Sequence, residues 1–387
     1  MLAGHLQEKK GLFYMVLSYK DEDKKRKTKW IPTGLPVKGN KKKAEAMLMQ
    51  ARKTYVPDRP ATVPVSEDML FAEYLWRWLK IAQSTIKPPT YASYAGMVKS
   101  TIDPYFRKRG YTLGNLTAAS IQDFYTEQLD RVTANTVIHY HAVIHRALKY
   151  AVKTDLIAVN PADKVERPKK NAFVGSFYDK QEINDLFCAA KDTQLELPVM
   201  LAAFYGLRRS EIVGLKWDAV DFEANTITIR HTVTTFNLDG KRVVYAADTT
   251  KTKSSMRTLP LVPMFREKLL ALQAEQETNR KLCGRSYCKD YLGYVCINQI
   301  GERINPSYIT KAFPDLLEKH SLRKIRFHDL RHSCASMLLA NGVPMKQIQE
   351  WLGHSDFSTT ANIYAHLDFH SKLSSAEAMM AGLGLVE

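Results

Sequence analysis

Four side chains that could act on a phosphate ester lie close together near the C-terminal end of the sequence. They are His328, Arg331, His354 and Tyr364. A guanidinium can donate paired hydrogen bonds to phosphate oxygens, and an imidazole can exchange a proton near neutral pH. A tyrosine hydroxyl can attack phosphorus and hold it as a covalent ester. Together, these residue types could bind a phosphate group and hold it as a covalent ester.

Helix signals around these residues predict how they are positioned. His328 and Arg331 are three residues apart, so on a helix they share one face and can reach the same point. Asn341-Gly342 is typical of a helix end, and Pro344 of the first position of the next helix. Apolar residues at helical spacing supply the buried faces, namely Leu330, Met337, Leu338, Ile348, Trp351 and Leu352.

This stretch resembles the C-terminal half of the active site of tyrosine recombinases, as found in phage and conjugative-element integrases. The resemblance rests on His328-x-x-Arg331, Leu352-Gly353-His354 and Tyr364, in the family's order and spacing. It implies that Tyr364 is the nucleophile and that His328 accepts or relays its proton. It also implies that His354 donates a hydrogen bond to a phosphate oxygen.

The resemblance continues upstream. Gly206-Leu207-Arg208 resembles the family's first arginine motif, which puts Arg208 in a catalytic role. Glu211 matches the family's acidic supporting position. Arg209 is the adjacent alternative, but on a helix that includes Arg208 it would point about 100° away.

A basic hairpin is expected between strands at Val243–Tyr245 and Arg257–Leu261, with a further strand at Thr226–Arg230 in the same small sheet. The family places its catalytic lysine on such a hairpin. Lys251 matches this position best, and Lys253 remains the second candidate.

The implied mechanism needs no cofactor. Arg208 and Arg331 bind the non-bridging oxygens, and Lys251 protonates the leaving 5′ oxygen. Because a 3′-phosphotyrosyl ester conserves the bond energy, neither a metal nor ATP is required. The sequence has no glycine-rich phosphate loop and no carboxylate cluster suited to a metal.

The composition favours a nucleic-acid partner. The 387 residues carry a formal net charge of +16, with a pI near 9.4, which suits binding to a polyanion. No run of eighteen apolar residues is present, so no membrane span is expected. Without an apolar leader, we expect a cytoplasmic, nucleoid-associated bacterial protein.

Two groups of residues invite a metal-site hypothesis that we do not favour. Cys283, Cys288 and Cys296 cluster in the sequence but lack a well-spaced fourth ligand, so reduced thiols are the preferred interpretation. His139, His141 and His145 recur at helical spacing, and we expect them at the surface or against phosphates.

We expect a multidomain protein of three DNA-binding parts. Residues 1–60 should form a small α+β arm-type DNA-binding domain, because they contain 15 Lys and Arg against 6 Asp and Glu. Its expected elements are strands at Leu12–Leu17 and Lys29–Thr33 and a helix at Lys41–Tyr55. Residues 66–165 should form an all-α core-binding bundle. Residues 174–387 should form a mainly α catalytic domain with a small antiparallel sheet, completing a tyrosine recombinase fold.

The leading hypothesis is a site-specific integrase of a phage or conjugative transposon that acts through a Holliday junction. Its expected partners are double-stranded DNA at core and arm sites, three further copies in a homotetramer, and an excisionase or host DNA-bending protein. The alternatives are a type IB topoisomerase-like strand transferase and a non-catalytic DNA-binding regulator. The intact residue set argues against the regulator, and the basic N-terminal part argues against the topoisomerase.

Overall fold

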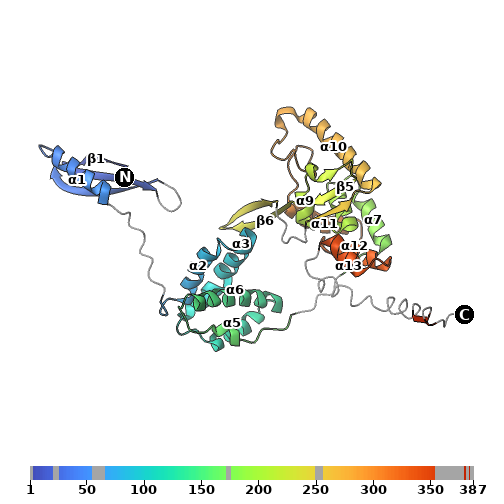
Figure 1. The fold of residues 1–387 in the computed structure, drawn as a ribbon, viewed down its shortest axis with the longest axis horizontal. Coiled ribbons are helices and arrows are strands. Elements are labelled where there is room, and N and C mark those ends of the chain that lie inside the picture. The colour runs from blue at the N-terminus through green and yellow to red at the C-terminus, as the bar shows by residue number, and fades with distance from the viewer. Residues whose placement is uncertain are drawn as a thin grey trace. The chain divides into compact units, whose positions relative to one another are not determined.

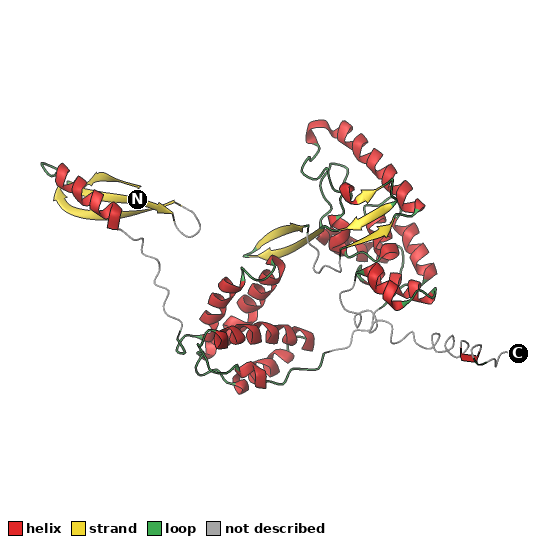
Figure 2. Cartoon of the chain, in the orientation of Figure 1, coloured by secondary structure: helices red, strands yellow, loops and turns green. Residues whose placement is uncertain are grey.

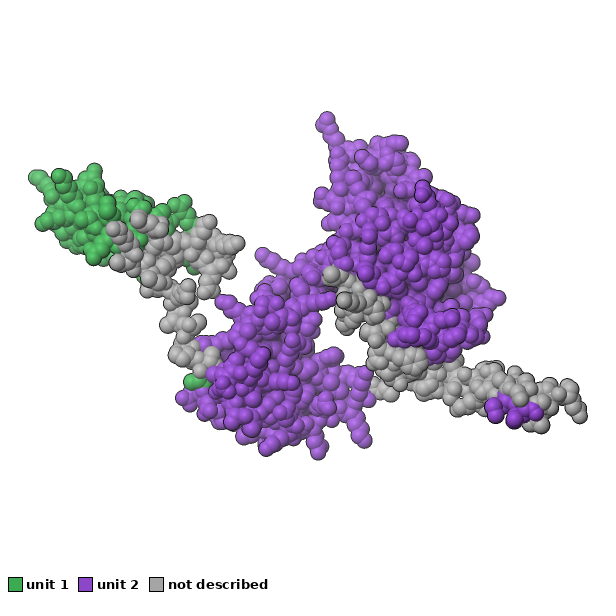
Figure 3. Space-filling view, viewed as in Figure 1, with its two compact units in different colours: residues 1–66 green, residues 67–387 purple. Residues whose placement is uncertain are grey.

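The computed structural model describes residues 3–20, 26–54, 66–170, 176–248, 256–353, 379–380 and 383. Contacts divide the chain into two compact units, residues 1–66 and residues 67–387 (Figure 3). The segments between the three expected domains lie partly outside the described residues, which exclude 55–65 and 171–175.

The first unit is an antiparallel sheet with one helix. Its elements are β1 (Ala3–Lys9), β2 (Leu12–Lys20), β3 (Arg26–Pro36) and α1 (Lys41–Thr54), with the strands in the order β1-β2-β3 (Figure 2). The sequence predicted all of these except β1. Lys10 and Gly11, with φ of 53° and 74°, form the two-residue turn that folds β1 back on β2.

The second unit begins with a helical part whose boundaries follow the hydrophobic pattern. It contains α2 (Phe71–Ala82), α3 (Pro88–Met97), α4 (Asp103–Arg109), α5 (Ala118–Leu129) and α6 (Ala134–Lys153), followed by a 3-10 turn at Pro161–Lys164. A π-helical segment, Val98–Ile102, lies between α3 and α4. Pro104 stands in the first turn of α4, where its missing backbone N–H is tolerated.

His141 in α6 corrects one expectation. Its side chain is buried, not at the surface, and its Nδ1 lies 2.9 Å from the hydroxyl of Tyr125 on α5. Burial, and then the neighbouring His145, lower the pKa of His141 to about 4. This histidine is therefore part of the core and is neutral at pH 7.

The rest of the second unit is mainly helical. It contains α7 (Lys180–Ala190), α8 (Glu196–Tyr205), α9 (Arg209–Gly214), α10 (Pro263–Cys283), α11 (Pro306–Lys319), α12 (Asp329–Ala340) and α13 (Met345–Leu352), with 3-10 turns at Trp217–Ala219 and Gly284–Ser286. Helix α12 packs between α8 and α13, and Figure 1 shows α12 and α13 side by side. A capping box begins α7, because Asp179 and Glu182 each accept the other's backbone N–H.

The strands form two sheets instead of the single sheet expected. β4 (Val220–Asp221), β5 (Thr226–Ile229) and β8 (Arg257–Pro260) make one, in the order β4-β5-β8. β6 (Thr232–Leu238), which the sequence analysis missed, pairs with β7 (Lys241–Ala247) in a separate hairpin. The hairpin's turn contains Asp239 and Gly240, both at positive φ, which is the Asp-Gly signal of a two-residue connection.

The fold class is as expected: several helical layers with small antiparallel sheets. One apolar core joins α7, α8, α9, α10, α11, β5 and the start of α12, with Tyr205, Ile227, Phe265, Phe313 and Leu330 all excluded from solvent. Across the described ranges, none of the helices is both long enough and apolar enough to span a bilayer.

Candidate active site

Gly206 ends α8 and sets the geometry of the first arginine. Its φ of 63° is left-handed, and a Cβ there would lie 2.3 Å from Cδ2 of Leu352, so only glycine fits. The chain then turns, and Arg208 adopts an extended conformation as the N-cap of α9. The expectation that Arg208 lies within a helix is therefore wrong, because the left-handed glycine breaks the helix before it.

Glu211 holds Arg208 by both its backbone and its side chain. One carboxylate oxygen accepts the Arg208 backbone N–H at 3.0 Å, and the other accepts Nη1 of Arg208 at 2.7 Å. The Glu211 side chain is 2% exposed. Burial would raise the pKa of Glu211, but Arg257, Arg208 and Arg331 together outweigh it and hold that pKa below its ordinary value. The buried carboxylate is therefore charged at neutral pH.

Arg331 lies on the buried side of α12 and is 2% exposed. Its Nη1 donates to the carbonyl of Gly206 at 2.5 Å, and its Nη2 donates to the carbonyl of Leu352 at 2.7 Å. Burial, reinforced by Arg208, lowers the pKa of Arg331 to about 9, so the guanidinium keeps its charge at pH 7. Arg331 thus joins the turn after α8 to the end of α13.

Three arginines bind consecutive carbonyls at the end of α13. Arg257 donates to Trp351 at 2.8 Å, Arg331 to Leu352 at 2.7 Å, and Arg208 to Gly353 at 3.2 Å. The last carbonyls of a helix lack partners within the helix and carry its negative dipole end, so cations are favoured there. Positive charge from three distant segments is therefore gathered immediately before His354.

His328 stands at the N-terminal end of α12, one turn before Arg331. It is an exposed residue, and its ring centroid lies 5.5 Å from that of His332. Partial burial, followed by the charges of Arg331, His332 and Arg208, lowers the pKa of His328 to about 4. The imidazole is consequently neutral at pH 7 and able to accept a proton.

The described residues bring together Arg208, Glu211, His328 and Arg331 of the predicted set. Lys251, its alternative Lys253, His354 and Tyr364 lie outside the described residues. Arg209, the weighed alternative to Arg208, donates instead to the hydroxyl of Thr310 on α11.

Sequence reasoning missed Arg257. Its side chain is 6% exposed, and its Nη2 lies 3.1 Å from the Glu211 carboxylate. The available signal was an arginine at the start of a strand that directly follows the lysine-bearing segment. That signal gives no partner, since Glu211 is 46 residues away in the sequence.

The first unit presents a basic and aromatic sheet face. Trp30 on β3 is 43% exposed, lies 6.2 Å from the ring of Tyr14, and has Nζ of Lys9 5.5 Å from its ring centroid. These residues lie on the sheet face opposite Leu17. On the Leu17 face, the side chains of Leu17 and of Leu48 on α1 occupy the space that a Cβ at Gly4 would need. An exposed aromatic ring under a cation suits contact with a nucleic acid.

The cysteine cluster does not form a metal centre in the part of the chain that the structure describes, where no group of three or more metal-ligating side chains is found. Cys296 is buried, which raises the pKa of its thiol to about 12, whereas Cys283 and Cys288 are partly exposed.

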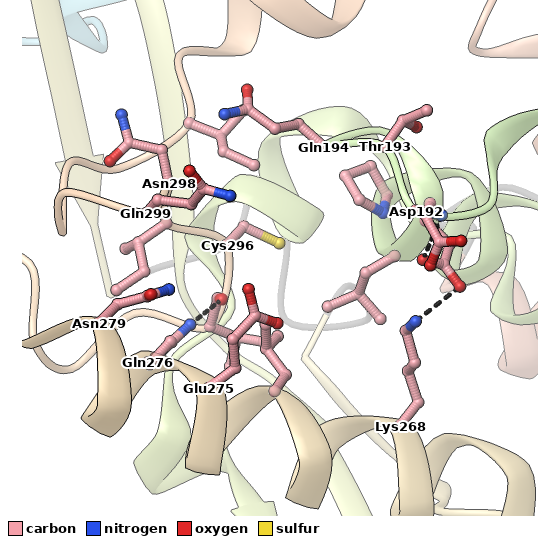
Figure 4. A pocket seen from close by; sticks show the side chains of 17 residues that line it. Asp192, Thr193, Gln194, Lys268, Glu275, Gln276, Asn279, Cys296, Asn298 and Gln299 are labelled. Atoms are coloured by element: carbon pink, nitrogen blue, oxygen red, sulfur yellow. Dashed lines mark hydrogen bonds and ion pairs between the residues drawn. The ribbon is translucent and has the colours of Figure 1, made fainter. Parts of the chain in front are cut away.

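A cavity of about 300 Å³ lies elsewhere in the second unit, between α10, residues 192–198 and residues 295–299 (Figure 4). An ion pair of 2.6 Å between Lys268 and Glu196 closes one side, and Gln276 donates to the carbonyl of Val295 on another. The described residues that line it do not include Arg208, Arg257 or Arg331, the three residues we call the arginine cluster. This cavity is therefore separate from the candidate active site.

Two family models match the chain. The phage integrase family matches residues 176–371, and the SAM-like N-terminal domain of phage integrases matches residues 70–129. A tyrosine recombinase XerC-like protein of Caldanaerobacter subterraneus subsp. tengcongensis is 28% identical over 81% of this chain and 83% of its own length. The ICEBs1 integrase of Bacillus subtilis is 25% identical over 86% of this chain and 88% of its own.

Solved structures share the fold. The Tn1549 transposon integrase, in complex with a circular intermediate DNA, matches 80% of this chain and 99% of its own with a TM-score of 0.66 at 18% identity. A lambda integrase tetramer bound to a Holliday junction matches 91% of this chain and 95% of its own, with a TM-score of 0.57 at 16% identity.

Proposed function

The chain belongs to the phage integrase family, the tyrosine recombinases, and from this premise we propose that it cuts and rejoins DNA through a 3′-phosphotyrosyl intermediate as the integrase of a mobile element. The observation that carries the proposal is the convergence of Arg208 and Arg331 on adjacent carbonyls, those of Gly353 and Leu352. Two guanidiniums 123 residues apart in sequence thereby meet directly before His354.

The proposed reaction is an in-line displacement at phosphorus. The Tyr364 oxygen forms a bond to phosphorus, the bond to the 5′ oxygen breaks, and His328 takes the tyrosine proton. Lys251, with Lys253 as the alternative, gives a proton to the leaving 5′ oxygen. Attack by a 5′ hydroxyl of another strand reverses these steps and releases Tyr364.

Charge on the pentavalent phosphorus is balanced by Arg208 and Arg331, with His354 as a further donor. Arg208, whose side chain is 32% exposed, is within reach of a ligand at the surface. Arg331 is 2% exposed, and its Nη2 donates to the Leu352 carbonyl. The turn at Leu352–Gly353 must therefore shift before Arg331 can donate to a phosphate oxygen. The neutral state of His328 supports its part, because a protonated imidazole could not accept the tyrosine proton.

The proposed substrate is double-stranded DNA at two kinds of site. Residues 66–165 and 174–387 form the core-binding and catalytic domains that grip the core site, which separate family matches for 70–129 and 176–371 support. Residues 1–60 form the arm-binding domain, which the exposed Trp30 under Lys9 supports. The protein acts on chromosomal DNA in a bacterial cytoplasm.

Four protomers assemble on the DNA, because exchange of both strand pairs through a Holliday junction requires four tyrosines. A lambda integrase forms such a tetramer on a junction, and the likeness of fold supports the same assembly here. An excisionase or a host DNA-bending protein sets the direction of the reaction.

The test uses DNA carrying the joined ends of the element, identified by sequencing the DNA that flanks the gene for this chain. Two such duplexes are incubated with the protein and separated by native and denaturing electrophoresis. The account expects both a covalent adduct and a four-way junction. An adduct with relaxation of one duplex and no junction would favour the topoisomerase alternative. DNA binding without an adduct would favour the regulator.

A further inference from the structure

Arg257 is buried and joins two segments of the candidate active site, the one that contains Glu211 and the end of α13. It opens β8, and its guanidinium reaches Glu211 on α9 at 3.1 Å and the Trp351 carbonyl on α13 at 2.8 Å. The α13 end is held independently by Tyr205, whose ring stacks on Trp351 with centroids 5.9 Å apart. Arg257 therefore fixes the helix end and the carboxylate relative to each other.

The same Glu211 oxygen that accepts from Arg257 also accepts the backbone N–H of Arg208, at 3.0 Å. The other oxygen accepts the Arg208 side chain at 2.7 Å. Two guanidiniums thus hold the carboxylate in one orientation from opposite ends. Without Arg257, one side of this clamp is lost, and Glu211 can rotate and take the Arg208 guanidinium with it.

Charge gives Arg257 a second effect on Arg208. If Glu211 were paired with Arg208 alone, its negative charge would cancel the positive charge needed at a phosphate. With Arg257 and Arg331 included, three guanidiniums surround one carboxylate, and the cluster carries a net charge of +2. Arg208 can then be oriented by Glu211 and still attract an anion.

We propose that Arg257 is a positioning residue for strand cleavage: it holds Glu211 and the end of α13 so that Arg208 is aimed and charged for the scissile phosphate. This inference rests on the proposed function, since it assumes that Arg208 acts on a phosphate. It assigns Arg257 no contact with the DNA.

The experiment measures the first-order rate of covalent adduct formation on a nicked duplex that traps the cleaved state. The variants are Arg257→Gln, Arg257→Lys, Arg208→Lys and the double variant Arg208→Lys/Arg257→Gln. Arg230→Gln is the matched control, because Arg230 is also a strand-end arginine paired with a carboxylate, Asp218 at 3.0 Å, but is exposed. Thermal unfolding and half-site binding are measured for every variant.

Arg257→Gln should slow adduct formation by about 10- to 100-fold, by analogy with the loss when a residue that orients a metal-binding side chain is replaced. Arg257→Lys should recover part of the rate, because an ammonium can pair with Glu211 but cannot reach both partners. Arg230→Gln should match the parent protein. In the Arg208→Lys background, Arg257→Gln should lower the rate of adduct formation by less than about 3-fold. If Arg257 acts through Arg208, its effect should largely disappear once Arg208 is replaced.

Equal fold-losses from Arg257→Gln in both backgrounds would overturn the inference and leave Arg257 a stabiliser of the fold. A parent-like rate for Arg257→Gln would overturn it as well. Failure of the parent protein itself to form an adduct would count against the proposed function instead, which separates the two outcomes.

Discussion

Arg331 donates a hydrogen bond of 2.7 Å to the carbonyl of Leu352, the residue at which α13 ends. The same guanidinium donates to Gly206, at the turn that releases Arg208 from α8. One buried arginine thus ties together the two segments that carry the other proposed phosphate-binding groups, Arg208 and His354. The site is organised around the end of a helix, where carbonyls with no partner in the helix attract cations.

Replacing Gly206 with alanine should unfold this arrangement. A Cβ at φ 63° is strained, and it would meet Leu352 at 2.3 Å, so we expect a loss of about 2–4 kcal/mol in the free energy of unfolding. Urea denaturation measures this loss. Gly96→Ala is the matched control, because Gly96 lies in α3 with nothing within 4 Å of the added Cβ, and it should be neutral or slightly stabilising. Equal stability of the two variants would refute the steric argument.

His328 should make stability depend on pH. Its folded-state pKa of about 4 lies below its ordinary value of 6.5, so between these pH values the unfolded chain binds a proton that the folded chain does not. Stability is therefore fully present above pH 6.5 and falls as the pH drops toward 4. His328→Gln removes this contribution, so its melting temperature should fall less than that of the parent protein between pH 7 and pH 4.5. Parallel curves for the two proteins would contradict the lowered pKa.

Cleavage should proceed in EDTA. The charge on the phosphate is proposed to be balanced by arginines and a lysine and not by a divalent cation. Adduct formation with EDTA in excess should match that in magnesium. Loss of the adduct on chelation, with recovery on adding magnesium or zinc, would show that the mechanism is wrong.

Deleting Met1–Arg59 should abolish binding to a second DNA sequence while cleavage at the core site continues. The isolated fragment should bind DNA with a steep salt dependence, each neutralised phosphate adding a slope of about −0.9 on a log–log plot. Trp30→Ala in that fragment should weaken binding at all salt concentrations without changing the slope, because the ring carries no charge. A fragment that binds no DNA at low salt would contradict the arm-domain proposal.

Local signals in the sequence show where individual helices begin and end. Asn341-Gly342 predicted the end of α12, as the structure has it, and the Asp179-x-x-Glu182 pattern forms the capping box that begins α7. Such signals succeed because they depend on partners within a few residues. The predicted start of α13 was wrong by one residue, because Pro344 is the N-cap of that helix and not its first residue.

The errors came from contacts between distant segments. The sequence predicted that the helix continues through Gly206 to Arg208. In the structure Gly206 adopts a left-handed conformation that ends the helix, and Leu352, Cys334 and Arg331 surround the position that a Cβ would take. Arg257 was missed because its partners, Glu211 and Trp351, lie 46 and 94 residues away. The spacing of the motifs identified the residues that are expected to contact the phosphate. It did not identify Arg257, which binds Glu211 and the end of α13.

The central claim is that Tyr364, which lies outside the described residues, is the nucleophile. Its hydroxyl should contribute little to DNA affinity but everything to the covalent step. The most direct measurement is denaturing electrophoresis of end-labelled element DNA after incubation with the parent protein or Tyr364→Phe, with half-site binding measured in parallel. The account predicts a 3′-linked protein–DNA adduct with the parent protein and none with Tyr364→Phe, at equal affinity. An adduct that persists in Tyr364→Phe would contradict it and direct the search to another tyrosine, Tyr308 or Tyr291.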